Sequence, residues 1–325
     1  MNFPEVVESL APDLERVEEA IRENFHSDVV LIPDVSGYLS RSGGKRVRPM
    51  LLLLSAKACG YEGPRAISLS CVVEYIHTAT LLHDDVVDGA EVRRGNASAN
   101  SKWGNEASVL VGDFLFSKSF SMMADDQDDR VIKTMAEACT LLSEGEVLQL
   151  VNMYNLRLTE GKYLDVIYRK TAALIAASCR VGAFLGDASP SVADAFFQFG
   201  TKVGYAFQLV DDALDYTGEE GRTGKTIGKD LREGNVTLPL LRVFSQAAPA
   251  EAERLSQIVV HSEAVDSAAL DDVLELIEKY KTIPYTLDRA QGYIEAAKAA
   301  LSVVPDSVPL DALRALADYI IERDY

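Results

Sequence analysis

Apolar residues recur at spacings of three and four along most of the chain, which is the pattern of helices that bury one face. Sustained alternation of apolar and polar residues, the pattern of a half-buried strand, does not occur. Breaks fall where Gly, Pro, Asp and Ser cluster, as in GNASANSKWG and TGEEGRTGKTIG. The pattern predicts an all-α fold. Its main helices are predicted over 46–59, 66–88, 105–123, 129–156, 161–185 and 191–216.

The organisation of these helices predicts one domain. From about residue 250 the chain continues with Ala- and Leu-rich helical segments that have acidic outer faces. No low-complexity linker and no fixed-period repeat divides the sequence, so a single domain over 1–325 is expected. Several central helices are apolar almost all round, so the other helices should wrap them.

Composition narrows the classes of function. Of the 325 residues 48% are hydrophobic, and the net charge of −18 comes from 50 Asp and Glu against 32 Lys and Arg. Such a surface repels nucleic acid, so we expect no nucleic-acid partner and we expect cations at acidic clusters. The 4 cysteines lack metal-ligand spacing and predict reduced thiols in a cytoplasmic protein. The acidic N-terminus does not resemble a signal peptide, and no apolar run approaches the ~20 residues that span a bilayer.

A first acidic cluster ends a predicted apolar helix in EYIHTATLLHDDVVDGAEVRRG. Asp84 and Asp88 are four residues apart and share one helix face, whereas Asp85 lies about 100° round the axis. Carboxylates gathered on a buried helix repel one another and need a compensating positive charge. Mg²⁺ is the best candidate, because it takes oxygen ligands and is usually shared with substrate phosphates. The alternative for this motif alone is a solvated acidic helix end.

A second cluster repeats the spacing in VGYAFQLVDDALDY, where Asp211, Asp212 and Asp215 end another apolar helix. Two such DDxxD clusters facing each other across a cavity would clamp a diphosphate through several Mg²⁺ ions, which makes two unrelated solvated ends the weaker explanation.

A third acidic run, ADDQDDR at 124–130, has no apolar helix running into it. We expect Asp126 or Asp128 to cap the next helix there, and the remaining charge to be solvated.

Basic residues that a diphosphate would need occur at several places. GGKRVRP brings Lys45, Arg46 and Arg48 to a predicted helix start, a position that suits phosphate groups. Taken singly, each such residue is equally well explained as an ordinary surface cation. The TGK sequence lacks the spacing and the preceding strand of a phosphate-binding P-loop. The other basic candidates are Arg93, Arg94, Lys170 (followed by Thr171), Lys225 and Lys229.

Seven motifs, in order along the chain, resemble those of the trans-type polyprenyl diphosphate synthases, the isoprenoid chain-elongation family. They are GGKRVRP, EYIHTATLLHDDVVDGAEVRRG, GDFLFSKSF, EGEVLQL, YRKTAAL, GYAFQLVDDALDY and GKTIGKDLREGNVTLPLL, and they cover nearly the whole chain. The resemblance implies the isoprenoid synthase fold, a bundle of mostly antiparallel helices around a central cavity. It also implies condensation of isopentenyl diphosphate with an allylic diphosphate, expected to be farnesyl diphosphate, at two or three Mg²⁺ ions shared with the diphosphate.

The resemblance implies roles for the residues of both clusters. Ionisation of the allylic diphosphate leaves a carbocation, which a dry cavity must protect from water. Asp85 and Asp212 would ligate the metal or orient its ligands, and Thr171 and Gln208 would turn oxygen dipoles toward the cation. The implied metal ligands are Asp84, Asp88, Asp211 and Asp215. The implied cations at the leaving diphosphate are Arg93, Lys170 and Lys225, with Lys229 also available.

Isopentenyl diphosphate would bind beside the cation, and the released diphosphate would remove its proton. The implied contacts are Lys45, Arg48, His77 and Arg94. His77 could instead be a satisfied core histidine. His83 beside Asp84 is also found in metal phosphohydrolases, but those need more His ligands than the 4 His of this chain supply. Asn235 stands where many relatives carry Lys, which weakens the case for a second cation in that loop.

Product length should depend on residues one turn before Asp84, where the growing tail first meets the protein. Ala79 and Thr80 are small there, whereas short-chain relatives carry aromatic residues, so the passage is expected to be open. Its floor is expected among large residues that plain core packing would also explain. These are Phe116, Phe120, Met122, Met123 and Met135. The motifs resemble most the long-chain enzymes, especially octaprenyl diphosphate synthases, which predicts about eight isoprene units for a quinone side chain.

Alternatives to a long-chain enzyme remain. One is a shorter-chain farnesyl or geranylgeranyl synthase, and another is a non-catalytic partner subunit, which should have damaged aspartate clusters. Head-to-head prenyl synthases and terpene cyclases lack the GGKRVRP motif. The family is typically homodimeric, and the apolar helix at 105–123 could supply the interface. The product would have to reach a membrane from a protein without an anchor.

Overall fold

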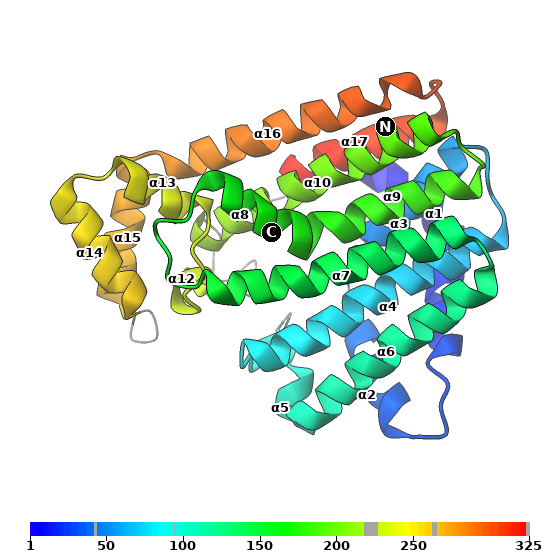
Figure 1. Ribbon diagram of the computed structural model, residues 1–325, viewed down its shortest axis with the longest axis horizontal. Coiled ribbons are helices and arrows are strands. Elements are labelled where there is room, and N and C mark those ends of the chain that lie inside the picture. Colours follow the sequence, from blue (N-terminus) through cyan, green and yellow to red (C-terminus); the bar gives the residue numbers. More distant parts are fainter. Residues whose placement is uncertain (42–43, 94, 218–226, 262–264, 323–325) are drawn as a thin grey trace. The chain divides into compact units, whose positions relative to one another are not determined.

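The computed structural model describes residues 1–41, 44–93, 95–217, 227–261 and 265–322. Helices form almost all of this part of the chain, and its only strands are the short antiparallel pair β1 (Val92–Arg93) and β2 (Asn96–Ala97) (Figure 1). The all-α prediction is confirmed. In chain order the remaining elements are α1 (Phe3–Asn24), α2 (Leu31–Arg41), α3 (Val47–Ala58), α4 (Pro64–Val87), α5 (Ala99–Trp103), α6 (Asn105–Asp126), α7 (Asp129–Val151), α8 (Glu160–Ile167), the π-helical segment η1 (Tyr168–Ala172), α9 (Ala173–Leu185), α10 (Pro190–Thr217), α12 (Lys229–Arg232), α13 (Leu238–Gln246), α14 (Pro249–Val260), α15 (Ser267–Lys279), α16 (Thr282–Ala300), the 3₁₀ turn η3 (Leu301–Val303) and α17 (Val308–Glu322).

The predicted helices are present, with two differences. The helix predicted over 129–156 ends at Val151, because the chain then turns and Tyr154, with a φ of 63°, donates its N–H to the carbonyl of Gly234 at 2.9 Å. The range 161–185 contains α8, η1 and α9 rather than one continuous α-helix. Short π-helical segments inside α-helices are frequent at functional sites, and η1 carries Lys170 and Thr171.

The chain divides into two compact units. The first consists of Met1–Cys139, Leu174–Gly200 and Ala300–Leu316, and the second consists of Thr140–Ala173, Thr201–Ala299 and Ala317–Tyr325. Each unit carries one of the two aspartate clusters. The single domain over 1–325 stays a prediction. None of the helices in the described ranges is long and apolar enough to cross a membrane.

The first unit is built around α4, which is apolar on nearly every side. Residues of α1, α3 and α6 pack against it, and α4 and α6 lie side by side (Figure 1). The buried side chains of α4 include Tyr75, Ile76 and Leu82, and burying one such side chain contributes roughly 1.5–3 kcal/mol. The hydroxyl of Tyr75 donates to the carbonyl of Ile21 at 2.7 Å, so its polar end is satisfied. This packing fixes the end of α4, which carries the first aspartates.

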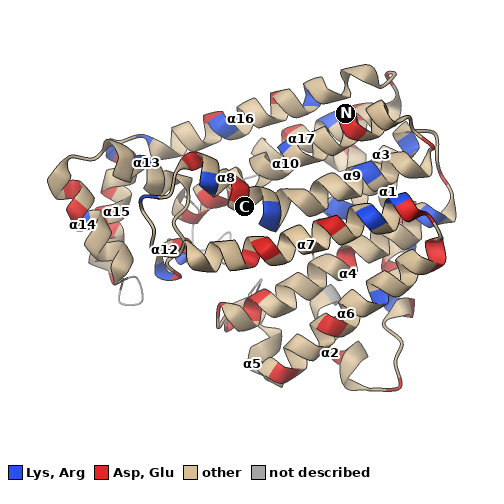
Figure 2. Ribbon diagram, in the orientation of Figure 1, with Lys and Arg blue, Asp and Glu red and all other residues tan. Residues whose placement is uncertain are grey.

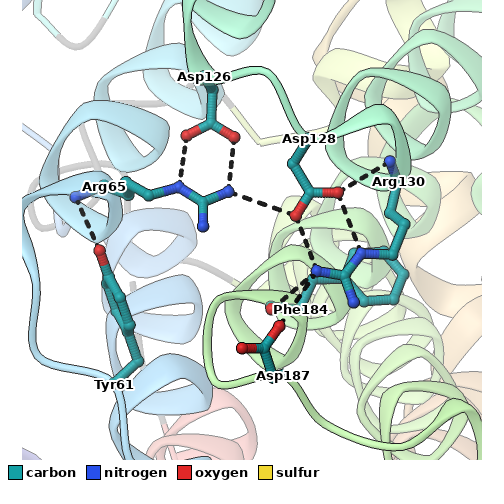
Figure 3. Close-up of polar contacts among 7 residues, drawn as sticks. All are labelled: Tyr61, Arg65, Asp126, Asp128, Arg130, Phe184 and Asp187. Atoms are coloured by element: carbon teal, nitrogen blue, oxygen red, sulfur yellow. Dashed lines mark hydrogen bonds and ion pairs between the residues drawn. The ribbon is translucent and has the colours of Figure 1, made fainter.

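A charged cluster joins the start of α4, the turn between α6 and α7 and the end of α9 (Figure 3). Arg65 donates two hydrogen bonds of 2.8 Å to Asp126 and a third of 3.3 Å to Asp128. Asp128 accepts the N–H of Arg130 at 3.0 Å, which confirms the expected cap on α7. The side chain of Arg130 reaches the carbonyl of Phe184 at 3.4 Å. The expectation that the remaining charge is solvated is wrong for Asp126, whose side chain is 6% exposed and paired with Arg65.

The second unit brings η1 close to α10. Gly204 of α10 lies so near Ala172 that an added Cβ would be 2.4 Å from the Cα of Ala172. No larger residue fits there without separating the two backbones. At the start of α8, Glu160 accepts hydrogen bonds of 2.8 Å from Tyr285 and 2.9 Å from Arg289 of α16. The close contact at Gly204 lets Gln208, one turn further along α10, reach Thr171 of η1.

Candidate active site

The first aspartate cluster stands at the C-terminal end of α4, which is visibly acidic in Figure 2. Asp84 is half-buried, Asp88 is exposed and Asp85 is fully buried. The N–H of Asp88 donates to the carbonyl of Asp84 at 2.8 Å and closes the last helical turn. A helix C-terminus carries partial negative charge and disfavours carboxylates. The negative charge collected at this end of α4 therefore favours a bound cation.

Asp85 is held by the residues that follow α4. Its Oδ1 accepts hydrogen bonds from Arg93, with Nε at 2.7 Å and the second contact at 2.6 Å, and its carbonyl accepts from Asn100 at 3.1 Å. The β1–β2 hairpin turns the chain back so that Arg93 reaches the aspartate. The other carboxylate oxygen, Oδ2, is buried with no hydrogen-bond partner among the described residues. Arg93, expected at the leaving diphosphate, thus neutralises Asp85.

In the second cluster, the middle aspartate is again the buried one. Asp212 is 2% exposed, whereas Asp211 and Asp215 are half-buried. Tyr163 donates its hydroxyl to Oδ2 of Asp212, and Gln208 donates its amide to Oδ1 at 2.8 Å. Burial raises the pKa of Asp212 to about 7, the charges of Asp211 and Asp215 add to the shift, and the two hydrogen bonds oppose it.

Asp215 organises the start of α12. Its carboxylate accepts the backbone N–H groups of Lys229 at 3.2 Å and Asp230 at 3.1 Å, and its carbonyl accepts that of Gly228 at 2.9 Å. This arrangement carries Asp230 toward the cluster. Burial raises the pKa of Asp230 well above its ordinary value, and the charges of Asp215, Asp212 and Asp211 add to that rise. A fourth carboxylate therefore increases the need for a cation here.

The π-helical segment η1 presents Lys170 and Thr171 on neighbouring positions. The ammonium of Lys170 lies 2.7 Å from Oε2 of Glu146, a residue of the EGEVLQL motif on α7. Thr171 is buried, and its hydroxyl donates to Oε1 of Gln208 at 2.8 Å. The structure thus brings together Thr171, Gln208 and Asp212, three residues that the sequence analysis placed in the site.

The basic residues expected to bind phosphate differ in their surroundings, beginning with those before α3. Arg46, with a left-handed φ of 49°, turns its guanidinium to Glu18 and to Glu74, the latter at 2.9 Å. Lys45 is exposed and Arg48 is half-buried. Lys229 is exposed and pairs with Glu233 at 3.1 Å. Two other expected cations, Arg94 and Lys225, lie outside the described residues.

His77, His83 and the product-length residues all lie in the first unit. His77 is half-buried, and His83 lies 3.4 Å from Asp113 and 3.2 Å from the carbonyl of Val109. Of the product-length candidates, Ala79, Met123 and Met135 are at most 1% exposed, whereas Thr80, Phe116 and Met122 are half-buried. Phe120 is 37% exposed, so its own unit does not pack it into a floor for the product passage.

The donors of both clusters fit Mg²⁺. All of them are carboxylate oxygens, which suit a hard cation, and the buried Oδ2 of Asp85 still has no hydrogen-bond partner among the described residues. In the described ranges no three His, Cys, Asp or Glu side chains gather into a ready-made metal cage. Mg²⁺ does not need one, because it binds through one or two carboxylates and completes its shell with water and phosphate oxygens.

Three site residues escaped the sequence analysis: Tyr163, Glu146 and Asp230. Glu146 lies in a quoted motif, and Asp230 follows the second lysine of GKTIGKD, so both had a local signal. Tyr163 had only a general one, because a tyrosine in an apolar helix needs a partner for its hydroxyl.

Comparisons with known proteins cover both units. A family model described as "Polyprenyl synthetase" matches residues 29–277. The chain is similar to octaprenyl diphosphate synthase of Escherichia coli strain K12, with 41% identity over 324 residues and 100% of both chains covered. Its structure is similar to a polyprenyl synthase of Caulobacter crescentus CB15 complexed with calcium and isoprenyl diphosphate (TM-score 0.95, 38% identity, 100% and 98% covered). A decaprenyl diphosphate synthase of Rhodobacter capsulatus is also similar (TM-score 0.94, 41% identity, 99% of both covered).

Proposed function

The chain belongs to the polyprenyl synthetase family, and from that premise we propose that it is a magnesium-dependent, chain-elongating prenyltransferase. It condenses isopentenyl diphosphate with an allylic diphosphate, which we take to be farnesyl diphosphate. The observation that carries the proposal is the repeated cluster: in each, a buried and hydrogen-bonded middle aspartate is flanked by two more accessible carboxylates.

Bound Mg²⁺ would supply Lewis-acid assistance to departure of the diphosphate. Asp84 and Asp88 in the first unit, and Asp211 and Asp215 in the second, would be the ligands of the Mg²⁺ ions. Asp85 and Asp212 would hold their helix ends in place, since each is buried and hydrogen-bonded.

Two residues of the second unit would face the developing allylic cation. Thr171 and Gln208 present oxygen atoms beside each other, joined by a hydrogen bond of 2.8 Å. Oxygen dipoles that are already fixed stabilise developing positive charge without reorganisation. Lys170, whose ammonium now lies 2.7 Å from Glu146, would also bring positive charge near the leaving diphosphate. The released diphosphate would take the proton from the condensed product.

Isopentenyl diphosphate would bind to hydrogen-bond donors among the basic side chains of the first unit. Lys45, Arg48 and His77 are the described members of this set, and Arg94 completes it. The pairing of Arg46 with Glu18 and Glu74 supports this division of roles, because it fixes the loop backbone and leaves phosphate binding to its neighbours.

We further propose a long-chain product, all-trans octaprenyl diphosphate, for a quinone side chain. Ala79 and Thr80 would leave the passage beside α4 open, and the buried Met123 and Met135 would contribute to its floor. The similarity to octaprenyl and decaprenyl diphosphate synthases supports a long product. The product would pass from a cytoplasmic enzyme to a membrane.

A homodimer is the proposed assembly. α6 exposes Val109 (37%), Leu110 (66%) and Phe120 (37%), and an apolar surface of this kind favours contact with another protein surface. Leu110→Glu should convert the dimer to a monomer in light scattering. A wild-type protein that is monomeric at micromolar concentration would contradict the assembly but not the activity.

The proposed activity is tested by sizing the products. The purified protein is incubated with Mg²⁺, farnesyl diphosphate and labelled isopentenyl diphosphate, and the dephosphorylated prenols are separated by length. Asp84→Ala and Asp211→Ala run in parallel, with Asp187→Asn as a control at a side chain that is 92% exposed. We expect a ladder ending near eight isoprene units, lost in both alanine variants and kept in the control.

Other outcomes separate the parts of the proposal. A labelled product that stops at geranylgeranyl length would keep the reaction class and overturn the open passage at Ala79 and Thr80. Absence of any Mg²⁺-dependent product with every allylic primer would overturn the enzyme and favour a non-catalytic partner subunit.

A further inference from the structure

A line of hydrogen bonds runs from the buried Tyr163 to Thr171 in the second unit. Tyr163 of α8 donates its hydroxyl to Asp212, and Gln208 donates its amide to the other oxygen of the same carboxylate at 2.8 Å. The hydroxyl of Thr171 donates to Oε1 of Gln208, also at 2.8 Å. Three elements, α8, α10 and η1, each supply at least one member of this relay.

The chemistry of the groups gives the relay one direction. The amide nitrogen of Gln208 can only donate a hydrogen bond, and it faces Oδ1 of Asp212. Once the amide nitrogen of Gln208 faces Asp212, its oxygen must face the opposite way, toward Thr171. The threonine hydroxyl has a single proton, and this proton is used on that oxygen.

Thr171 is therefore left with lone pairs only. A hydroxyl without such a partner rotates freely and can turn its proton, the positive end of its dipole, toward a nearby cation. With its proton engaged, Thr171 offers only the negative end of the dipole to whatever lies beside it. Preorganised dipoles of this kind stabilise developing charge in a site that excludes water.

The anchor of the relay is Tyr163 of α8, which is 4% exposed. A phenol has a single proton, and Tyr163 donates it to Oδ2 of Asp212. Tyr163 and Asp212 lie 49 residues apart in the chain, and both are almost completely buried.

We propose that Tyr163 is a positioning residue for the prenyl transfer, acting through Asp212 and Gln208 to hold Thr171 as a hydrogen-bond acceptor toward the allylic cation. The inference rests on the proposed function, because it needs a cation to form beside Thr171. It adds a residue outside the aspartate clusters and the substrate contacts, and it explains why a tyrosine is buried at this point of α8.

The first test is a double-mutant cycle on the single-turnover rate of one condensation. Tyr163→Phe removes the donor to Asp212, and we expect it to lower this rate about 10- to 100-fold, with KM for both substrates nearly unchanged. Thr171→Val removes the hydroxyl on which Tyr163 acts. In that background Tyr163→Phe should cause little further loss, because linked residues give non-additive effects. Losses that multiply, or an unchanged rate in Tyr163→Phe, would overturn the inference.

A binding measurement supplies a readout other than activity. One probe is a farnesyl diphosphate analogue with a protonated amine at the cationic carbon, and the other is farnesyl thiodiphosphate, which is uncharged at that carbon. Tyr163→Phe should weaken the amine analogue about 10-fold or more in calorimetry and leave the thiodiphosphate unchanged, since only the first mimics the cation. Equal loss for both probes would reduce Tyr163 to a purely structural role.

Tyr75→Phe is the matched control, because it removes a buried tyrosine hydroxyl that donates to the carbonyl of Ile21 in the first unit. It should lower the unfolding midpoint without changing the single-turnover rate. If Thr171→Val does not fold, the same cycle is run with Gln208→Met, which breaks the relay one step earlier. A wild-type protein with no activity would overturn the proposed function, whereas an active wild type with an unaffected Tyr163→Phe variant would overturn this inference alone.

Discussion

Asp215 would combine two tasks in one side chain. Its two carboxylate oxygens accept the N–H groups of Lys229 and Asp230, and we propose the same side chain as a metal ligand. Backbone N–H groups at the start of a helix need such an acceptor, and losing one costs about 1 kcal/mol. At this residue the proposed metal site and the start of α12 would therefore share the same carboxylate.

Comparing Asp215→Asn with Asp215→Ala separates the two tasks. Both substitutions remove the negative charge, but asparagine keeps one acceptor oxygen. Without Mg²⁺ we expect the alanine variant to unfold more easily than the asparagine variant by about 1 kcal/mol, while both lose most of the prenyl-transfer activity. Equal unfolding midpoints for the two variants would show that Asp215 does not hold α12.

At the scale of elements, Gly204 sets the distance between α10 and η1. An added Cβ would lie 2.4 Å from the Cα and 2.5 Å from the Cβ of Ala172, and backbone atoms cannot move aside as a flexible side chain can. Gly204→Ala should therefore separate the two elements and stretch the hydrogen bond between Thr171 and Gln208. We expect a loss of about 1–3 kcal/mol in the free energy of unfolding and a fall in prenyl-transfer rate.

Gly292→Ala is the control for that substitution. Gly292 lies inside α16, and an added Cβ there meets nothing within 4 Å. Alanine should raise the free energy of unfolding by about 0.5–1 kcal/mol, because it favours the helix over the unfolded chain. Opposite signs at the two glycines, measured by denaturant unfolding, are expected. A stabilising effect at Gly204 would contradict the close contact.

The charged cluster between α4, α6, α7 and α9 predicts a pH dependence of stability. The hydrogen bond from Arg130 is the largest cause that lowers the pKa of Asp128, from 3.8 to about 2. A carboxyl whose pKa is lower in the folded protein stabilises the fold above its unfolded pKa, and that contribution is lost as the pH falls through the folded value. The contribution of Asp128 should thus decline between about pH 4 and pH 2.

Thermal unfolding of the wild type and Asp128→Asn measures this contribution. The difference between their midpoints should be constant from neutral pH to about pH 4 and should shrink below it. Asp187→Asn changes a carboxylate of the same cluster whose side chain is 92% exposed, and it should leave the midpoint unchanged across the range. A difference for Asp128→Asn that does not change with pH would assign its effect to the cap on α7 alone.

At the scale of the whole molecule, the sequence predicted features that residues close together in the chain determine, and it missed most others. Helical spacing and the i, i+4 aspartates are local patterns, so the helices and the accessible carboxylates Asp84 and Asp88 were predictable. The π-helical form of η1 was not, because five residues give too little periodicity to distinguish it from an α-helix.

Contacts between distant segments were also beyond the sequence. Arg65 and Asp126 are 61 residues apart, and nothing in ADDQDDR indicates a buried partner for its aspartates. Arg93 was a local candidate for phosphate binding, yet the hairpin after α4 directs it to Asp85. A charged residue can be predicted to need a partner, but tertiary packing decides which partner it has.

Product length depends on the whole molecule, but a single substitution can test it. Thr80 lies four residues before Asp84, one turn away on the same face of α4, and its hydroxyl donates to the carbonyl of His77 at 2.8 Å. Its methyl group is then the part that a growing tail would meet. Phenylalanine there should block a passage along α4 while leaving the aspartates in place. We expect Thr80→Phe to shorten the product from about eight isoprene units to about four, the product of a single condensation on farnesyl diphosphate.

Thr78→Phe is the matched substitution, because Thr78 is also half-buried but lies six residues before Asp84, about 120° round the helix from it. It should leave the product length unchanged. Sizing the dephosphorylated prenols of both variants and the wild type decides the matter. If the Thr80→Phe product keeps its full length, the tail does not run along this face of α4. If both variants shorten it equally, added bulk anywhere on α4 restricts the passage, and Thr80 has no special position.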